Sequence, residues 1–287
     1  MKDILTSPRI MDMKRKRRVR RIRLNVLIFV LFLSIVYALG YFSSNHRITI
    51  NRISITGTRI LKEEEVLTIV KNALSGKYIK LFSRSNSFIY PKNQIHKELT
   101  TKFPRIEKLS INRDNWNTLH IDISERFGSS LYCGKNVPDE KLEVGENCYF
   151  VNNDGYIFDK APYFSGNIYL KYYIGLPEGV GDPMGKQILS PDIFHKYIRF
   201  IDGLTTLGFK PIYVVIGGGD NSIYLDHIEG VTAPKIIFTN ENDMDNILDN
   251  LSLSMNKPEF ANEIKGKYTT LLYIDLRFKN KVLYKFE

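Results

Sequence analysis

Cysteine is scarce in this sequence, whose 287 residues include only Cys133 and Cys148. Neither cysteine belongs to a C-x-x-C motif and no histidine lies near them, which argues against a zinc site. The run Gly217–Gly219 is not followed by the Lys-Ser/Thr of a phosphate-binding loop, and no local motif groups serine, histidine and aspartate. The sequence therefore predicts no metal site, no cofactor and no catalytic residues.

Charge and proline are both absent from residues 24–42, LNVLIFVLFLSIVYALGYF. A helix of this length extends ~29 Å at ~1.5 Å per residue, enough to cross the hydrocarbon core of a bilayer. The run therefore predicts a transmembrane helix. One alternative is a cleaved signal peptide, for which Ala38-Leu39-Gly40 supplies a cleavage pattern. The other, a buried core helix, is disfavoured because the run has no polar face.

Positive charge is concentrated before this run. Residues 1–23 contain ten Lys and Arg and two Asp, whereas the rest of the chain has 31 basic and 29 acidic residues. The net charge of +10 is thus mostly a property of the tail, and we expect no nucleic-acid partner. Basic flanks stay in the cytoplasm, so we expect a single-pass protein with its N-terminus inside, its bulk outside, and its tail against anionic lipid of the bilayer.

The two cysteines lie on the side of the membrane where thiol pairs usually oxidise. We therefore expect a structural disulfide between Cys133 and Cys148, closing the intervening loop as a hairpin arm. Closing a loop of this length stabilises a fold by about 3 kcal/mol. Free thiols are the alternative.

The segment after the apolar run predicts an α+β domain. Its elements follow in the order strand, helix, helix, strand, strand, at residues 48–57, 61–74, 91–104, 106–114 and 118–126. The first helix has apolar residues at helical spacing, namely Val66, Ile69, Val70, Ala73 and Leu74. This order predicts two helices on one face of a three-stranded sheet.

Signals for β structure dominate after residue 127. Asp154-Gly155 predicts a hairpin turn, and a second hairpin is predicted across the turn 217–221. Two helices interrupt the strands. The first begins after Ser190, with the apolar stripe Ile193, Tyr197, Phe200, Ile201 and Leu204; the second covers 241–255 with Asn240 as its cap.

Five short motifs in this order resemble the FtsQ/DivIB family of bacterial cell-division proteins. They are Ile53-Ser54-Ile55-Thr56-Gly57, Phe103-Pro104-Arg105-Ile106, Asn117-Thr118-Leu119-His120-Ile121, Glu125-Arg126 and the block YIDLRF at residues 273–278. One departure is Trp116, which stands where the family usually has proline. The resemblance implies four parts: a basic cytoplasmic tail (1–23), a transmembrane helix (24–42), a POTRA domain (46–126) and an FtsQ-type β-domain (127–287).

The resemblance also implies a function. Proteins of this family are non-enzymatic scaffolds of the divisome, placed in the bacterial plasma (inner) membrane at the division septum, and they hold FtsB/DivIC-like and FtsL-like partners through the distal edge of the β-domain. By position, the implied partner-binding residues are Phe278, Asn280, Val282, Tyr284, Lys285 and Phe286. The strand at 50–56 is the implied edge of the POTRA domain for contacts with other divisome proteins.

The end of the chain supports an edge strand independently. Apolar residues alternate with polar ones from Leu272 to Phe286, which predicts a strand with one apolar face. A terminal strand is a candidate for β-augmentation, in which a partner adds a strand. The alternative is an edge protected by Lys279, Lys281 and Lys285. Residues 279–281 are predicted to form either a turn or a bulge.

Two other functions stay open. A POTRA-bearing assembly or secretion factor would hand over substrate strands instead of building a divisome. An anchored, sortase-like cysteine transpeptidase would use Cys133 as its nucleophile, although Cys148 offers that residue a partner and no family motif surrounds it.

Overall fold

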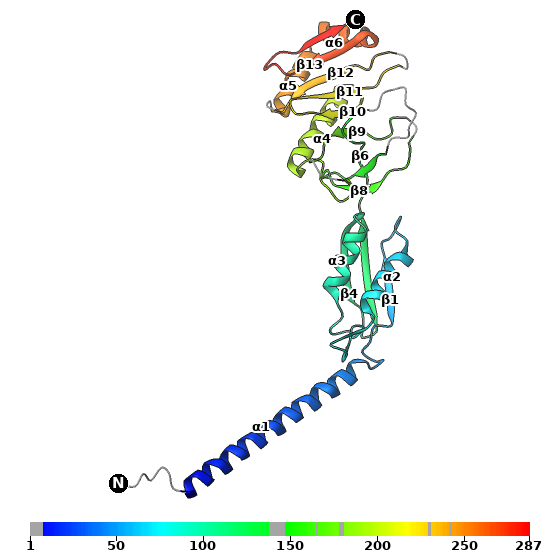
Figure 1. The fold of residues 1–287 in the computed structure, drawn as a ribbon. Helices are drawn as coiled ribbons and strands as arrows, with labels where there is room; N and C mark the ends of the chain where they lie inside the picture. Colours follow the sequence, from blue (N-terminus) through cyan, green and yellow to red (C-terminus); the bar gives the residue numbers. More distant parts are fainter. Residues whose placement is uncertain (1–7, 138–146, 165, 178–180, 229–230, 241–242) are drawn as a thin grey trace, which may run out of the picture. The chain divides into compact units, whose positions relative to one another are not determined.

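The computed structural model describes residues 8–137, 147–164, 166–177, 181–228, 231–240 and 243–287, with side chains from residue 15 onward. It has a mixed α+β fold with an N-terminal apolar helix (Figure 1). By its contacts the chain divides into two compact units, Met1–Lys102 with Lys108–Glu125, and Phe103–Glu107 with Arg126–Glu287. The predicted domain bounds, 46–126 and 127–287, stay predictions.

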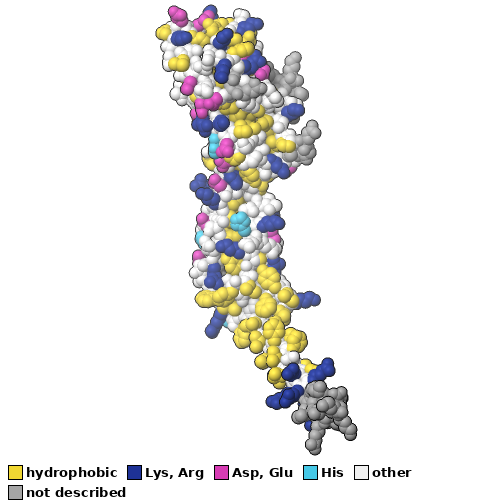
Figure 2. All heavy atoms as spheres, turned by 90° about the vertical axis from the view of Figure 1, so that its left-hand side faces the viewer, with side chains coloured by type: hydrophobic (Ala, Val, Ile, Leu, Met, Phe, Trp, Pro, Cys, Tyr) yellow, Lys and Arg dark blue, Asp and Glu magenta, His cyan; other side chains and the backbone are white. Residues whose placement is uncertain are grey.

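Helix α1 (Pro8–Ser43) begins in the basic tail and continues through the apolar run. Its part Arg15–Ser43 includes a window of mean hydropathy 2.4, and it is the one helix within the described ranges that is long and apolar enough to cross a membrane. Lys and Arg side chains gather near its N-terminal end and hydrophobic ones follow (Figure 2). The helix is consistent with a single-pass membrane protein.

The rest of the first unit follows the predicted order, with one addition. Its elements are β1 (Arg52–Thr56), α2 (Glu63–Leu74), β2 (Lys77–Tyr78), β3 (Phe82–Ser83), α3 (Lys92–Lys102), β4 (Ile106–Arg113) and β5 (Thr118–Glu125). The sheet order is β1-β5-β4, with β1 parallel to β5. All five predicted apolar positions of α2 are buried. The short hairpin β2–β3 is the addition, since its strands are too short to show a sequence period.

Two of the motifs act together at the end of this sheet. Gly57 has φ +83°, and a Cβ there would lie 2.0 Å from the carbonyl oxygen of Ile123, so only glycine fits. The Glu125 carboxylate accepts hydrogen bonds from the backbone N–H groups of Arg59, Ile60 and Leu61 at 2.7–3.2 Å. The carboxylate therefore fixes the loop that leads into α2.

The second unit is a nine-stranded sheet with helices against one face. Its strands are β6 (Ser130–Tyr132), β7 (Tyr149–Val151), β8 (Ile157–Lys160), β9 (Lys171–Ile174), β10 (Pro211–Ile216), β11 (Asp220–Leu225), β12 (Lys235–Thr239), β13 (Leu271–Asp275) and β14 (Leu283–Phe286). The sheet order is β14-β13-β12-β11-β10-β9-β6-β7-β8. Three helices, α4 (Pro191–Thr206), α5 (Met244–Met255) and α6 (Pro258–Gly266), contribute side chains to its core.

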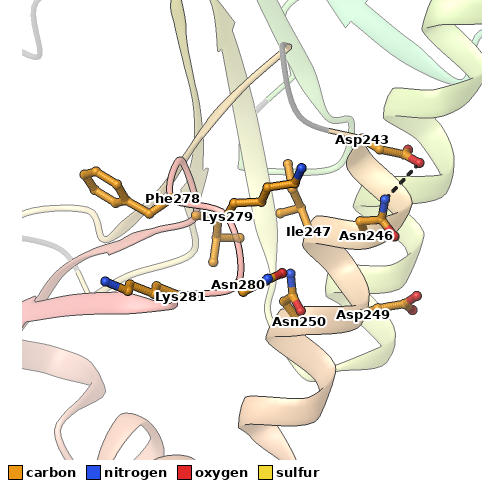
Figure 3. A pocket seen from close by; sticks show the side chains of 10 residues that line it. Asp243, Asn246, Ile247, Asp249, Asn250, Phe278, Lys279, Asn280 and Lys281 are labelled. Atoms are coloured by element: carbon orange, nitrogen blue, oxygen red, sulfur yellow. Dashed lines mark hydrogen bonds between the residues drawn. The ribbon is translucent and has the colours of Figure 1, made fainter.

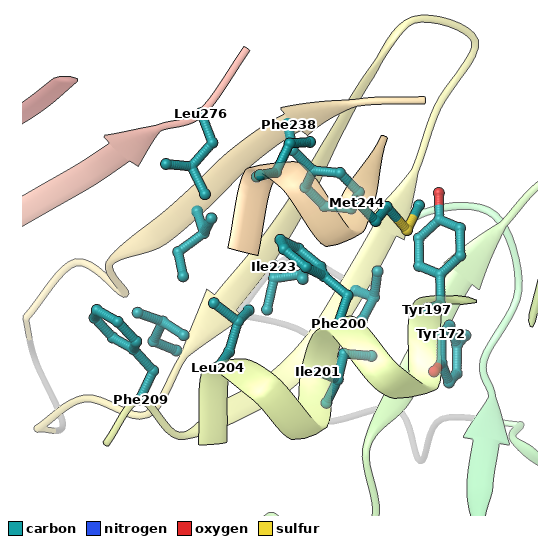
Figure 4. Close-up of a cluster of buried hydrophobic side chains, with 14 of the residues drawn as sticks. Tyr172, Tyr197, Phe200, Ile201, Leu204, Phe209, Ile223, Phe238, Met244 and Leu276 are labelled. Atoms are coloured by element: carbon teal, nitrogen blue, oxygen red, sulfur yellow. The ribbon is translucent and has the colours of Figure 1, made fainter. Parts of the chain in front are cut away.

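The core of the second unit explains the alternation in its strands. Ile223 and Phe238 point toward Phe200 and Leu204 of α4, and all four side chains are buried (Figure 4). Alternate strand residues face this core, as expected for a sheet with one covered face.

Several sequence expectations need correction. On α4, Tyr197, Phe200, Ile201 and Leu204 are buried as predicted, but the first core position is Phe194, and Ile193 is 45% exposed. The cap of α5 is Asp243, whose side chain accepts from the N–H of Asp245. Asn240 lies three residues before this cap, and its side chain accepts from Tyr197 and Asn221 instead. The second unit has a third helix, α6, in addition to the two predicted.

Two predicted turns are confirmed, and one predicted feature lies mostly outside the described residues. The Asp154-Gly155 turn joins β7 to β8, and Gly217–Gly219 is the turn between β10 and β11. The hairpin arm predicted between the two cysteines lies mostly outside the described residues.

Candidate partner-binding edge

The last strand of the chain lies at one end of the nine-stranded sheet. Among the strands that the structure describes, β14 pairs with β13 alone, in antiparallel register, with Ile274 opposite Tyr284 and Asp275 opposite Leu283. The alternating run at the C-terminus is thus two strands. Between them the chain turns at 279–281, where Asn280 has φ +60°, a conformation that asparagine tolerates better than most residues. No strand of the described residues pairs with the outer side of β14.

The pairing decides which residues present those outer groups. The N–H of Leu276 bonds Ile237 of β12, and the N–H of Glu287 bonds Thr270 on the β13 side. Because main-chain groups alternate along a strand, Leu283 and Lys285 bond toward β13, and Tyr284 and Phe286 direct their N–H and C=O outward. The free edge is therefore formed by the backbone of Tyr284 and Phe286.

An ion cluster holds the chain where it leaves β13. Asp275 is only 4% exposed and accepts from the Arg277 N–H and Nε at 3.0 Å each and from its Nη2 at 2.6 Å. Arg277 also donates from Nη1 to Asp220 at 2.6 Å. Burial alone raises the pKa of Asp275, but the bonds from Arg277 outweigh burial and the pKa is lowered. The YIDLRF block thus has a structural role in ending β13.

Helix α6 holds the side chains of the edge strand from one face. The Tyr284 hydroxyl donates to Glu263 Oε2 at 2.7 Å, and its ring lies 5.2 Å from that of Phe260. The Lys267 ammonium lies 5.3 Å above the Phe286 ring and 3.1 Å from Glu263 Oε1. The hydrogen bond from Tyr284 lowers the pKa of Glu263, and the same bond raises the pKa of Tyr284. These contacts keep the two aromatic side chains on the covered face.

The predicted binding residues therefore lie in different environments. Phe278 is 51% exposed, Asn280 and Lys285 are exposed, and Val282 packs partly into the core. The Tyr284 side chain contacts α6 and the Phe286 side chain contacts Lys267, the residue after α6, so both offer a partner mainly their backbone. Their roles in binding stay predictions.

A groove adjoins the turn that leads into β14. Its volume is about 260 Å³, and it lies between the first half of α5 and the residues 276–281. The Asn280 side chain points toward Asn250 of the helix, whereas Phe278 points away from the groove (Figure 3). Carboxylates of Asp243 and Asp249 line one wall, and Lys279 and Lys281 belong to the other. Most residues that line the groove are polar, and the lining ends at Lys281, just before β14 begins.

Sequence reasoning missed the support that α6 gives to this edge. Phe260, Glu263 and Lys267 have spacings of three and four residues, which place them on one side of a helix. That spacing was the available signal, but α6 has nine residues and directly follows α5, so its period is short. Leu283, which is 45% exposed on the face opposite Tyr284, was also missed.

The two cysteines lie far from this edge in sequence, next to the ends of β6 and β7. Cys133 and Cys148 form a disulfide with a Cα–Cα distance of 4.3 Å, beside the apolar residues Leu131 and Ala161. Bonded in this way, Cys133 is not available as a nucleophile. Within the described ranges no group of three or more His, Cys, Asp or Glu is arranged to hold a metal ion.

Comparison with known proteins identifies the first unit. Residues 48–126 match the family model described as POTRA domain, FtsQ-type. No curated protein matches the chain. An FtsQ-type POTRA domain suggests a role in a divisome scaffold and in protein–protein interaction, and domains of this type are typically non-catalytic. Residues 48–126 are thus an FtsQ-type POTRA domain.

Proposed function

We propose that the chain is a non-enzymatic, single-pass scaffold of the bacterial divisome that binds FtsB/DivIC-like and FtsL-like partners by strand addition at β14. Its helix α1 anchors it in the plasma membrane with the N-terminus in the cytoplasm. The POTRA domain contacts other divisome members, with β1 as its free sheet edge. The basic residues of α1 between Arg15 and Arg23 contact anionic lipid.

The free edge of β14 is the observation that carries this proposal. Natural sheets usually protect such an edge, and here Tyr284 and Phe286 point their main-chain groups outward. A partner strand would bond these groups, and its side chains would meet Leu283 and Lys285 on the open face. Three lysines of this region, Lys279, Lys281 and Lys285, are exposed, which favours a partner segment with acidic residues.

Two substitutions of Tyr284 distinguish the contribution of its backbone N–H to partner binding from that of its side chain. Tyr284→Ala removes the ring and its hydroxyl but keeps the outward N–H. Tyr284→Pro removes the same groups and also that N–H, and proline is tolerated where the N–H of an edge strand faces solvent. One lost hydrogen bond of about 1 kcal/mol weakens binding roughly fivefold.

The assay is recovery of the divisome partners by the full-length, membrane-solubilised protein, with binding constants measured for the purified partners. We expect Tyr284→Pro to bind roughly fivefold more weakly than Tyr284→Ala. Equal binding by both variants and the unchanged protein would show that no partner strand bonds this edge. Melting of the two variants controls for loss of the strand itself.

A further inference from the structure

One end of the first unit gathers the loops and termini nearest to helix α1. The chain leaves α1 at Ser43 and enters β1 at Arg52, and parallel β5 begins beside it, with Thr118 opposite Arg52. The turn 114–117 before β5 therefore lies at the same end. The segment 84–87 lies at this end as well, because the N–H of Ile50 donates to the carbonyl of Ser85 and the Arg113 guanidinium donates to the carbonyl of Ser87.

The hairpin β2–β3 packs directly against the last turn of α1. Gly40 is buried, and a Cβ there would lie 3.3 Å from Leu81 Cβ. Ser43 Oγ accepts from the N–H of Ser83 at 3.1 Å, and the Asn86 amide donates to the Ser43 carbonyl at 3.0 Å. Gly40 lies ~4.5 Å along the helix axis before Ser43. The hairpin is thus level with the end of the apolar run.

The tip of this hairpin exposes an apolar side chain at a conformational cost. Ile79 is 85% exposed and has φ +49°, a region in which a β-branched residue is rare. Lys80 follows with φ +60°. In water an asparagine or glycine would suit this position better, so the isoleucine indicates an apolar surrounding.

A second apolar group lies in the neighbouring loops of the same end. Phe88 and Trp116 are 58% and 52% exposed, and their ring centroids lie 4.9 Å apart. The Arg113 guanidinium lies 5.2 Å and 5.3 Å from the two rings. Aromatic rings beside a cationic group are typical of the membrane interface.

The rest of the first unit shows no such accumulation. Outside α1 its exposed large hydrophobic residues are Ile60, Ile79, Phe88, Ile89 and Trp116. Only Ile60 lies at the opposite end, after β1. Lys77 and Lys80 accompany the hairpin tip, and both line an open groove of about 660 Å³ together with Tyr41 and Phe42 of α1. Figure 2 shows hydrophobic side chains continuing from the helix onto the adjoining domain.

We infer that this end of the POTRA domain is a lipid-binding surface that sits in the headgroup region of the bilayer. Ile79, Phe88 and Trp116 lie at the boundary of the acyl chains, and Lys77 and Lys80 bind lipid phosphates. The bilayer is the occupant because the hairpin is fixed to the last turn of α1. The inference rests on the membrane span in the proposed function but is independent of strand addition at β14.

Trp116 makes a direct test possible, because it is the single tryptophan of the chain. The full-length protein is reconstituted in vesicles of phosphatidylcholine and phosphatidylglycerol, with and without bromine on the acyl chains. We expect brominated lipid to quench Trp116 strongly and aqueous iodide to quench it weakly. Quenching by iodide alone would place the ring in water and overturn the inference.

Two relocated reporters provide a matched comparison. Trp116→Phe with Ile79→Trp places the only tryptophan at the hairpin tip, and Trp116→Phe with Ile60→Trp places it at the far end, where Ile60 is 65% exposed. We expect lipid quenching for the first and iodide quenching for the second, a difference of several-fold. Equal iodide quenching of both would assign the exposed apolar residues to a protein partner instead.

Flotation separates failure of this inference from failure of the anchor. If the protein does not float with vesicles after an alkaline wash, α1 does not span the bilayer, and both the anchor and the lipid-binding surface are wrong. If the protein floats but Trp116 is quenched only by iodide, the anchor stands and the lipid-binding surface alone is wrong.

Discussion

The substitution Asp275→Asn tests whether the ion cluster after β13 holds the edge strand in place. Asp275 is buried, and its two carboxylate oxygens accept three hydrogen bonds from Arg277. Asparagine keeps the shape and one acceptor oxygen, so it can still bond the backbone N–H. It loses the charge and the acceptor for Nη2.

The expected cost follows from these contacts. A hydrogen bond to a charged group contributes about 1.5–3 kcal/mol, and Asp275 retains part of its bonding as asparagine. We therefore expect a loss of about 2 kcal/mol in the free energy of unfolding of the second unit. For a unit of this size, that loss lowers the melting temperature by about 6 °C. Partner binding at β14 should weaken as well, because the turn after Asp275 sets the position of that strand.

The stabilisation by the Asp275 carboxylate should depend on pH. The pKa of Asp275 is lower in the folded protein than in the unfolded chain, so its contribution is present above the unfolded value of about 4. It is lost as the pH falls below that value, through the lower folded pKa. The asparagine does not titrate. The difference in stability between the two proteins should therefore be full at pH 7 and shrink below about pH 4.

Calorimetry of the full-length protein in detergent, at several pH values, measures this difference. The control is Asp249→Asn, which removes one exposed carboxylate from the groove beside the same turn and should change stability by less than about 0.5 kcal/mol. A stability difference for Asp275→Asn that is equal at pH 3 and pH 7 would refute the electrostatic explanation and leave only altered packing.

Three further predictions concern other parts of the fold. Gly57→Ala should destabilise the POTRA domain by at least about 2 kcal/mol, because it combines a positive φ with a clash against the Ile123 carbonyl, and urea unfolding measures it. Replacing Cys133 and Cys148 together by serine should cost about 3 kcal/mol in thermal melting and leave partner binding at β14 unchanged. Tyr197→Phe should cost about 1 kcal/mol. Burial raises the pKa of Tyr197 to about 12, so that difference should hold below pH 10 and be lost as the pH rises through 12.

Each of these predictions has a matched control or a contrary result. Gly218 has no atom within 4 Å of its Cβ position, so Gly218→Ala should be nearly neutral, and an equal cost at both glycines would contradict the clash. If the double serine variant is folded but binds the partners more weakly than the unchanged protein, then the disulfide contributes to the binding edge at β14, contrary to the prediction. A cost for Tyr197→Phe that persists above pH 12 would indicate lost packing instead of the bond to Asn240.

The sequence predicted most elements of the POTRA domain because their signals are local. The five buried positions of α2 follow from the helical period alone, and the turn at 114–117 separates two clear strands. It misplaced features that depend on contacts distant in sequence. Asn240 was predicted as a helix cap, but it accepts from Tyr197 and Asn221, which no local pattern shows. Phe194 is buried instead of Ile193, because both residues lie about one turn before Tyr197 and the helical period alone does not choose between them.

The amino-acid sequence by itself determined the apolar helix, the strand–helix–helix–strand–strand order and the alternation at the C-terminus, because each depends on the spacing of neighbouring residues. Only the tertiary structure decided that this alternation is two strands, that β14 is a free edge, and that α6 holds Tyr284 on the covered face. It alone also brought the β2–β3 hairpin to the end of α1. These features depend on which segments become neighbours, and hydrogen bonds between residues up to 43 positions apart fix that choice.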